Sequence, residues 1–151
     1  RVIARIRPLG WHVVLHLDAP DIVPLSDMIE RLPVPFVIDH MGRVGAALGP
    51  AQPAVHALLA LSRLERCWIK VCGAERIAKP PFVDAVPIAV AIVAALPDRT
   101  LWGTDFPHPN LAIPVDEADL VDLVPRFATT PEMQRRLLVD NPARLFGFPP
   151  A

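Results

Sequence analysis

The sequence is poor in cysteine, in net charge and in long apolar runs, and each shortage excludes a class of protein. Its two cysteines, Cys67 and Cys72, are too few for a disulfide framework and favour a reducing cytoplasm. Their odd separation places them on opposite faces of a strand, so we expect them not to pair. A formal net charge of −1 without a basic stripe gives a nucleic-acid partner no electrostatic basis. The longest uncharged apolar run, Ala85–Pro97, is shorter than the roughly 20 residues that a membrane span needs.

A secretory signal is also missing, because the chain begins RVIARIRPLG with neither a methionine nor an apolar signal segment. Val2, Ile3 and Ile6 lie among arginines and precede Pro8 and Gly10, a pattern typical of the last turns of a helix. A natural protein rarely begins inside a helix. We therefore expect this sequence to belong to a longer protein.

Short apolar segments alternate with helical ones along the chain. We expect strands at Trp11–Leu17, Phe36–Asp39, Cys67–Val71 and Arg99–Asp105. We expect helices at Ser26–Leu32, Pro53–Leu64, Phe82–Leu96, Asp116–Arg126 and Pro131–Val139, with Pro87 as a kink or an early-turn residue. The segments Gly42–Pro50 and Gly73–Pro81 are expected to be loops. Four such alternations predict an α/β fold with parallel strands.

This alternation is compatible with an open doubly wound sheet and with a (β/α)₈ barrel. No glycine-rich G-x-G-x-x-G motif follows any expected strand, so the main sign of a dinucleotide-binding fold is missing. In a β/α barrel, catalytic side chains lie at the carboxyl ends of several strands. Ionisable residues should therefore gather at that end of the strands if the chain is part of such a barrel.

All four expected strands do end in ionisable residues. In chain order these are His16 and Asp18, then Asp39, His40 and Arg43, then Glu75 and Arg76, and finally Asp105 and His108. A single aspartate at a strand end is usually a turn former or a helix cap, which is our interpretation of Asp18 and Asp21. Four coincident strand ends indicate a functional site instead.

Asp105 is the candidate general base of this site. Gly103 and Thr104 precede it and Pro107 follows, so the backbone is constrained where it leaves the strand. A fixed carboxylate beside imidazoles can accept a proton from water. The alternative is a buried turn aspartate that accepts hydrogen bonds from backbone amides.

His40, Arg43 and Arg76 are candidates for contacts with a substrate. His40 could polarise a carbonyl oxygen or bind a metal, or it could be a core histidine. The guanidinium groups of Arg43 and Arg76 can bind carboxylates bidentately and indicate an acidic small-molecule substrate. Either arginine could equally form a salt bridge at the rim, for example with Glu75.

The remaining histidines differ in their position. His108 lies between two prolines and either contacts a substrate or caps the following turn. His12 begins a strand, at the wrong end for catalysis, and His56 lies in the middle of a helix. We expect His12 and His56 to be structural.

Several segments together resemble the amidohydrolase superfamily, in the branch typified by 2-pyrone-4,6-dicarboxylate lactonase. They are DHMGR at Asp39–Arg43, WIKVCGAERI at Trp68–Ile77, LWGTDFPHPN at Leu101–Asn110 and NPARLFGF at Asn141–Phe148. The resemblance covers nearly the whole chain. It implies that residues 1–151 are a partial domain, the C-terminal part of a TIM-like (β/α)₈ barrel with about four parallel strands.

The resemblance also implies an activity, the hydrolysis of a lactone in a dicarboxylate produced by aromatic degradation. In that family the strand-end aspartate activates water, which matches Asp105. The histidine of the DHMGR segment polarises the lactone carbonyl, which matches His40. An arginine after the third of these strands binds a substrate carboxylate, which matches Arg76, and Arg43 is expected to assist.

Two features depart from the family pattern. The paired His-x-His histidines of the first barrel strand are missing, and so are arginines that precede this segment, which agrees with a chain that begins inside a helix. About half of the barrel and half of the site should therefore lie outside this sequence. His16 also stands where we expect a tyrosine in the lactonase, which leaves the exact substrate open.

The sequence leaves three hypotheses. A metal-independent lactonase is favoured, because no histidine ends the third strand and Arg76 would compete electrostatically with a divalent cation. The second is a zinc-dependent amidohydrolase or decarboxylase on the same barrel, with His40 and Asp105 as zinc ligands and His16 as a further one. The third is a catalytically incomplete fragment that needs its missing half, because an open half-barrel exposes edge strands at Trp11–Leu17 and Arg99–Asp105.

Overall fold

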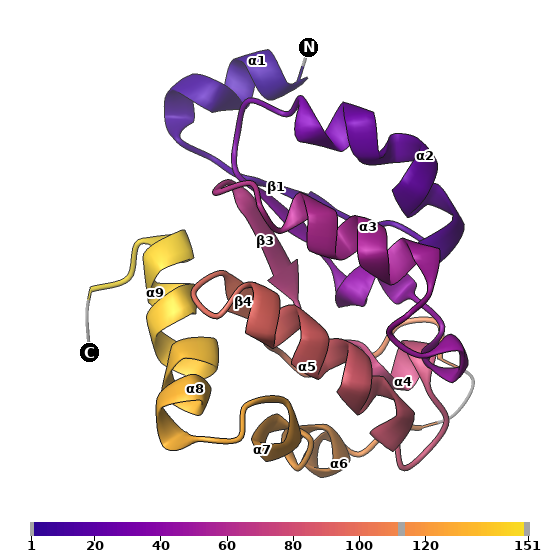
Figure 1. The fold of residues 1–151 in the computed structure, drawn as a ribbon. Helices are drawn as coiled ribbons and strands as arrows, with labels where there is room; N and C mark the ends of the chain where they lie inside the picture. Colours follow the sequence, from indigo (N-terminus) through magenta and orange to yellow (C-terminus); the bar gives the residue numbers. More distant parts are fainter. Residues whose placement is uncertain (1, 112–113, 150–151) are drawn as a thin grey trace.

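Four parallel strands form one sheet in the order β1-β2-β3-β4 in the computed structural model, which describes residues 2–111 and 114–149 (Figure 1). The strands are β1 Val13–Leu15, β2 Phe36–Ile38, β3 Cys67–Lys70 and β4 Thr100–Leu101. Each strand pairs with the next one along the chain, and the order never reverses. A doubly wound sheet reverses its order at a switch point. The sheet is therefore part of a TIM-like barrel, as predicted.

Helices lie before, between and after the strands, and one face of the sheet is covered by the longer of these helices. They are α1 Val2–Ile6, α2 Ala19–Glu30, α3 Pro53–Leu61, α4 Ala74–Ile77, α5 Val86–Ala95, α6 Glu117–Val121, α7 Val124–Phe127, α8 Pro131–Arg135 and α9 Asn141–Phe146. Short 3₁₀ turns occupy Arg7–Leu9, His40–Arg43, Ala46–Leu48 and Val83–Ala85, and a π-helical turn at Arg136–Asp140 joins α8 to α9. Figure 1 shows α2, α3 and α5 side by side in front of the sheet. The longest helix, α2, has 12 residues, and none of the helices in the described ranges could span a bilayer.

The two faces of the sheet bury different sets of side chains. Phe36, Ile38 and Ile69 point toward the helices and join the main core with residues such as Leu58 and Ile92. Each such side chain stabilises the fold by roughly 1.5–3 kcal/mol when it is fully buried. These contacts hold the helices against the strands and so fix the loops between them.

The opposite face of the sheet corresponds to the interior of a barrel. Val37, Trp68 and Leu101 form a smaller cluster there with Leu145 of α9. Val14 lies opposite Val37 in the register and is 51% exposed. Side chains on this face of a complete barrel pack against those of the other strands.

Two predicted boundaries were wrong for reasons connected with proline and with backbone conformation. Helix α2 begins at Ala19 and not at Ser26, because Pro20 lies in its first turn, where the missing N–H needs no partner. The fourth strand ends at Leu101 and not at Asp105. Asp105 has a φ of 67°, which no extended strand contains.

Other boundaries changed by smaller amounts. The predicted helix Asp116–Arg126 is divided into α6 and α7, with Pro125 in the first turn of α7. The predicted loop Gly73–Pro81 contains the short helix α4. Pro87 lies in the first turn of α5, so the early-turn alternative is confirmed.

Both cysteines are free and buried, so the prediction that they do not pair is confirmed. Burial raises the pKa of the Cys67 thiol to about 12. Burial also raises the pKa of Cys72, and the nearby Asp39 carboxylate adds to that effect. A buried thiol that stays protonated is a poor nucleophile. Neither cysteine is a candidate for covalent catalysis.

Candidate active site

The parallel strands bring the predicted site residues to one edge of the sheet. His16 follows β1, His40 follows β2, Arg76 lies in α4 after β3, and Asp105 and His108 lie in the loop after β4. Carboxyl ends of parallel strands meet at one edge, which is where β/α barrels place their active sites. The side chains of His40, Arg76 and Asp105 are in direct contact there.

Asp105 is held between one histidine and one arginine. Its Oδ1 lies 2.9 Å from Nε2 of His40. Its Oδ2 accepts a hydrogen bond of 2.6 Å from Nε of Arg76 and lies 2.5 Å from Nη2. The side chain of Asp105 is 20% exposed, while those of His40 and Arg76 are almost completely buried. The carboxylate is therefore fixed but remains accessible to a small molecule.

The pKa of Asp105 reflects two opposing effects. Partial burial raises the pKa of this carboxyl, but the contact with His40 and the hydrogen bonds from Arg76 lower it more strongly. The result is a pKa below the ordinary value for aspartate. Asp105 is thus ionised at neutral pH, which is the state that a proton acceptor needs.

Arg76 also connects α4 to the loop that carries Asp105. Its Nη1 and Nη2 both donate hydrogen bonds to the carbonyl oxygen of Pro109, each at 3.2 Å. A planar guanidinium that donates to a carboxylate and to a carbonyl at once has little rotational freedom. In the free protein the donors of Arg76 are therefore used by Asp105 and Pro109.

Gly73 allows His40 and α4 to approach each other closely. Gly73 has a φ of +74°, a conformation that glycine adopts without steric cost. A Cβ atom added at this position would lie 2.8 Å from Cδ2 of His40. The residue before α4 must therefore be small as well as left-handed.

Several non-glycine residues of the site have a left-handed backbone. The φ angles are 51° at His40, 50° at Arg43, 67° at Asp105 and 54° at His108. Such conformations cost of order 1–3 kcal/mol each and persist only where the surrounding contacts impose them. Their concentration in the predicted site residues supports a functional role for these loops.

A second carboxylate and a lysine lie behind His40. Asp39 Oδ1 is 3.4 Å from Nδ1 of His40 and 3.0 Å from Nζ of Lys70, and the Cys72 thiol donates to it at 3.6 Å. A carboxylate at Nδ1 orients an imidazole ring and leaves Nε2 toward the site. Lys70 was missed in the sequence, although a single charge in the apolar segment CWIKV was a signal for it.

Arg43 and His16 lie at the rim of this site. Arg43 forms a salt bridge of 3.0 Å with Asp18, so its partner is not the Glu75 that the sequence offered as an example. His16 is exposed, and its ring centroid lies 5.1 Å from that of His40. Arg43 is thus held at the rim by the protein, whereas His16 extends the group of imidazoles at the strand ends.

The other histidines lie away from Asp105. The ring of His12 packs edge-on against Phe146 of α9, with 5.5 Å between the centroids. His56 is exposed on α3. Both positions agree with the structural roles expected for them.

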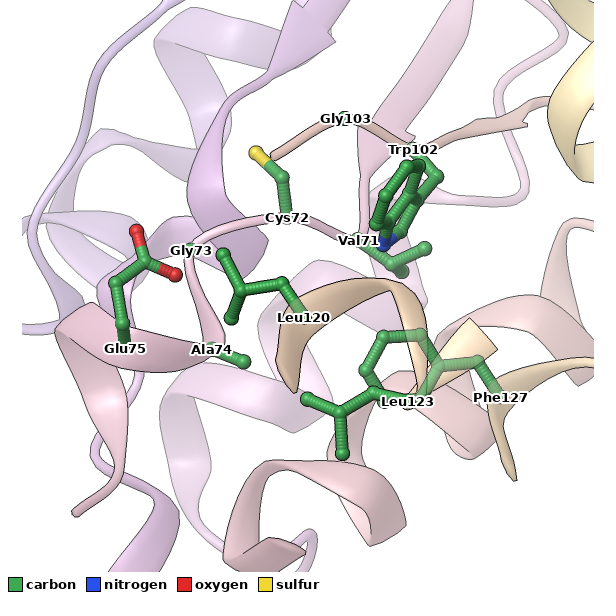
Figure 2. Close-up of a pocket in the computed structure, with 10 residues that line it drawn as sticks. All are labelled: Val71, Cys72, Gly73, Ala74, Glu75, Trp102, Gly103, Leu120, Leu123 and Phe127. Atoms are coloured by element: carbon green, nitrogen blue, oxygen red, sulfur yellow. The ribbon is translucent and has the colours of Figure 1, made fainter. Parts of the chain in front are cut away.

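His108 lies between two carboxylates that the sequence did not single out as a pair. Its Nδ1 is 3.6 Å from Glu75 Oε1, and its Nε2 is 3.5 Å from Glu117 Oε1. Glu75 lines a cavity of about 10 Å³, at the end away from Leu123 and Phe127 (Figure 2). A cavity of this size holds at most one water molecule. Sequence spacing gave no signal for Glu117, because it approaches His108 from another element.

Two groups of side chains in the described ranges offer ligand atoms for a metal ion. They are His16, Asp39 and His40, and Glu75, Asp105 and His108. In both groups a protein cation already contacts a carboxylate: Lys70 contacts Asp39, and Arg76 contacts Asp105. A divalent cation placed beside these charges would be repelled, so the residues present fit a zinc ion poorly.

The chain thus places a carboxylate between a histidine and an arginine at the strand ends of a partial β/α barrel. The family model described as Amidohydrolase matches residues 1–148. The chain therefore belongs to the amidohydrolase family.

The chain is similar to lactone-cleaving relatives. It is 41% identical to the 4-sulfomuconolactone hydrolase of Hydrogenophaga intermedia, over 97% of this chain and 50% of the relative. It is 40% identical to the 2-pyrone-4,6-dicarboxylate hydrolase of Comamonas testosteroni, over 96% of this chain and 52% of the relative. The chain spans about half the length of the curated relatives it matches.

Solved structures have the same fold over the whole chain. A probable 2-pyrone-4,6-dicarboxylic acid hydrolase from Acinetobacter baumannii, with citric acid bound, superposes with a TM-score of 0.83 at 27% identity, over 97% of this chain and 56% of that one. A zinc-bound amidohydrolase from Burkholderia multivorans superposes with a TM-score of 0.82 at 19% identity, over 97% of this chain and 56% of that one. At that identity the second likeness shows the fold alone.

Proposed function

We propose that the protein containing this chain hydrolyses a lactone that carries carboxylate groups, of the 2-pyrone-4,6-dicarboxylate type, without a metal ion. The observation that carries the proposal is the ionised Asp105 held between Nε2 of His40 and the guanidinium of Arg76. The similarity to 4-sulfomuconolactone and 2-pyrone-4,6-dicarboxylate hydrolases supports the same chemistry. Buried free cysteines also agree with a cytoplasmic protein.

In the proposed reaction Asp105 accepts a proton from the attacking water, and the oxygen of that water bonds to the lactone carbonyl carbon. His40 lies beside the reacting carbonyl and stabilises the charge that develops on its oxygen. The ester C–O bond then breaks, and the leaving oxygen takes up the proton that Asp105 accepted, which restores the carboxylate. The Asp39 carboxylate lies 3.4 Å from Nδ1 of His40 and accepts a hydrogen bond from the backbone N–H of His40.

Arg76 would change its partner when substrate binds. In the free protein it donates to Asp105, which keeps this carboxylate a weak base. A substrate carboxylate that takes over some of these donors would leave Asp105 more basic at the moment when a water must be activated. Arg43, His108 and His16 would complete the binding of the carboxylates and the ring.

A zinc-dependent amidohydrolase or decarboxylase is the second candidate function. The close approach of His40 and Asp105, with His16 beside His40, is the observation in its favour. His40 and Asp105 would then be ligands, and Arg76 would have to move away from Asp105. We favour the metal-free arrangement because both Arg76 and Lys70 already neutralise the carboxylates.

The 151 residues by themselves are proposed to be inactive. They contain no His-x-His pair, and the relatives of known activity are about twice as long. Tests of activity therefore need the full-length protein.

The proposed function is tested by replacing Asp105 in the full-length protein. We expect Asp105→Asn to lower kcat for 2-pyrone-4,6-dicarboxylate by about 10²–10⁴-fold, because the general base is lost while the shape is kept. Asp98→Asn is a matched control, since Asp98 is 59% exposed and forms a loose ion pair with Arg136 at 3.8 Å. Near-normal turnover by Asp105→Asn would refute the role of this residue as base.

Metal analysis separates the two candidate functions. The metal-free proposal predicts full activity after treatment with a strong chelator and a zinc content far below one ion per chain. Stoichiometric zinc that is lost together with activity would establish the zinc-dependent alternative instead.

A further inference from the structure

Glu75 is a buried carboxylate that the proposed reaction does not use. Its side chain has no exposed surface, and neither of its oxygens has a hydrogen-bond partner among the described residues. A buried carboxylate without a counter-charge is costly, so neighbouring cations should compensate it. Among the described residues, Arg76 and His108 are the cations that form ion pairs with Glu75, with Nε of Arg76 at 3.7 Å and Nδ1 of His108 at 3.6 Å from the same oxygen.

The two carboxylates that flank His108 differ in their access to solvent. Glu75 is completely buried on the Nδ1 side, whereas Glu117 is 44% exposed on the Nε2 side. Glu117 and His108 also line a cleft of about 400 Å³ with Phe106 and Pro107. That volume lies within the range of small-molecule sites. The Nε2 side of the ring is therefore the side that a ligand can reach.

A bound metal ion between Glu75, Asp105 and His108 could also compensate the buried charge of Glu75, but the structure favours Arg76 in that role. These residues offer ligand atoms within 4.8 Å of one another. Arg76 lies against two of them, at 2.6 Å from Asp105 and 3.7 Å from Glu75. The positive charge that a metal ion would supply is thus already provided by the guanidinium.

We propose that Glu75 is a positioning residue that holds His108 with Nε2 directed to the cleft, and that Glu117 occupies the place of a substrate carboxylate until substrate displaces it. The ring lies between a buried carboxylate at 3.6 Å and an exposed one at 3.5 Å, and both are close contacts without a hydrogen bond. The buried Glu75 is the permanent partner, and the exposed Glu117 is the exchangeable one. This inference rests on the proposed function for the identity of the substrate.

Two glutamate-to-glutamine variants of the full-length protein test the inference, because their effects on KM should have opposite signs. Glu75→Gln should raise KM for 2-pyrone-4,6-dicarboxylate by about tenfold or more, as removal of an orienting partner does at other sites. Glu117→Gln should lower KM by about two- to fivefold, the size expected for one exposed ion pair. Glu65→Gln, on an exposed residue away from the cleft, is the matched control.

A binding measurement keeps the inference separate from the proposed function. Isophthalate is a planar dicarboxylate that cannot be hydrolysed, so calorimetric titration with it reports binding alone. The order of affinity should be Glu117→Gln, then unchanged protein, then Glu75→Gln. Nitrogen NMR of His108 should show a different Nδ1 signal in Glu75→Gln than in the unchanged protein.

Each result supports or overturns the inference. An unchanged Nδ1 signal and unchanged isophthalate affinity in Glu75→Gln would overturn the positioning role. Weaker isophthalate binding by Glu117→Gln would contradict the displacement of Glu117 by a substrate carboxylate. If Glu75→Gln does not fold, the affinity of Glu117→Gln alone tests the inference. Lack of lactone hydrolysis by the unchanged protein, together with the expected order of isophthalate affinities, would reject the proposed function while leaving the inference intact.

Discussion

Asp105 and Arg76 are counter-ions in the free protein, and this contact fixes the pH range in which Asp105 can act. The pKa of Asp105 lies below its ordinary value of about 3.9, because His40 and Arg76 outweigh the opposing effect of burial. A carboxyl with a lowered pKa stabilises the folded state above its unfolded pKa. This contribution is lost as the pH falls through the folded pKa.

The same contact predicts different acid limbs in two pH profiles. The limb of kcat/KM reports the free enzyme, so it should lie below about pH 4 if Asp105 is the base. The limb of kcat reports the substrate complex, where Arg76 has partly turned to the substrate carboxylate and the pKa of Asp105 is higher. We therefore expect the kcat limb at the higher pH. The pH profiles of kcat and kcat/KM, measured where the substrate is fully ionised, check this order. Limbs in the reverse order would contradict the transfer of Arg76 from Asp105 to a substrate carboxylate.

At the scale of residues, the strand-end rule predicted much of the site. His40, Arg76 and Asp105 lie in contact because parallel strands end at one edge, and this follows from the chain order alone. Lys70 and Glu117 could not be predicted in the same way, because their roles depend on which side chains approach them from other elements. The left-handed φ angles were equally hidden, since they occur at residues other than glycine.

At the scale of elements, the turn from β3 into α4 determines how closely the backbone at Gly73 can pack against the ring of His40. Gly73→Ala adds a Cβ 2.8 Å from Cδ2 of His40 at a φ of +74°. We expect a loss of stability of more than about 1 kcal/mol from the backbone and the clash together. We also expect a large loss of kcat in the full-length protein, because His40 must move away from Asp105.

Gly147→Ala is the matched control for this variant. Gly147 has nearly the same φ, +72°, at the end of α9, but an added Cβ would meet no atom within 4 Å. It should therefore lose about 1 kcal/mol of stability through the backbone alone and keep its kcat. Chemical denaturation and steady-state kinetics of both variants separate the two effects. Equal kcat values would show that Gly73 matters only for the backbone.

The existence of the elements was easier to predict than their ends. All four strands lie inside the predicted segments, because short runs of β-branched and apolar residues mark strands. Helix α2 was predicted too short at its start, because it begins at Ala19 with Pro20 in its first turn and continues through Pro24. The end of β4 depended on the loop contacts of Asp105, which no local pattern contains.

At the scale of the whole molecule, the sheet has one face that helices cover and one where Leu145 of α9 packs on β2, β3 and β4 but Val14 of β1 stays exposed. Edge strands β1 and β4 each pair on one side only within the described ranges. Trp11 and Val14 are 61% and 51% exposed near one of these edges. Unpaired strand edges with apolar side chains are templates for association with another chain.

The 151-residue chain, expressed by itself, is therefore expected to self-associate through the edge at β1. Sedimentation velocity over a range of concentrations should show species larger than a monomer. Val14→Lys should reduce this association, because a charge on an edge strand opposes pairing with a further strand. Val90→Lys is the control, since Val90 is 41% exposed on the helix α5 and offers no strand edge. Equal association of the two variants would place the contact elsewhere, whereas a selective effect of Val14→Lys would show that the open edge of the sheet is what a complete barrel has to cover.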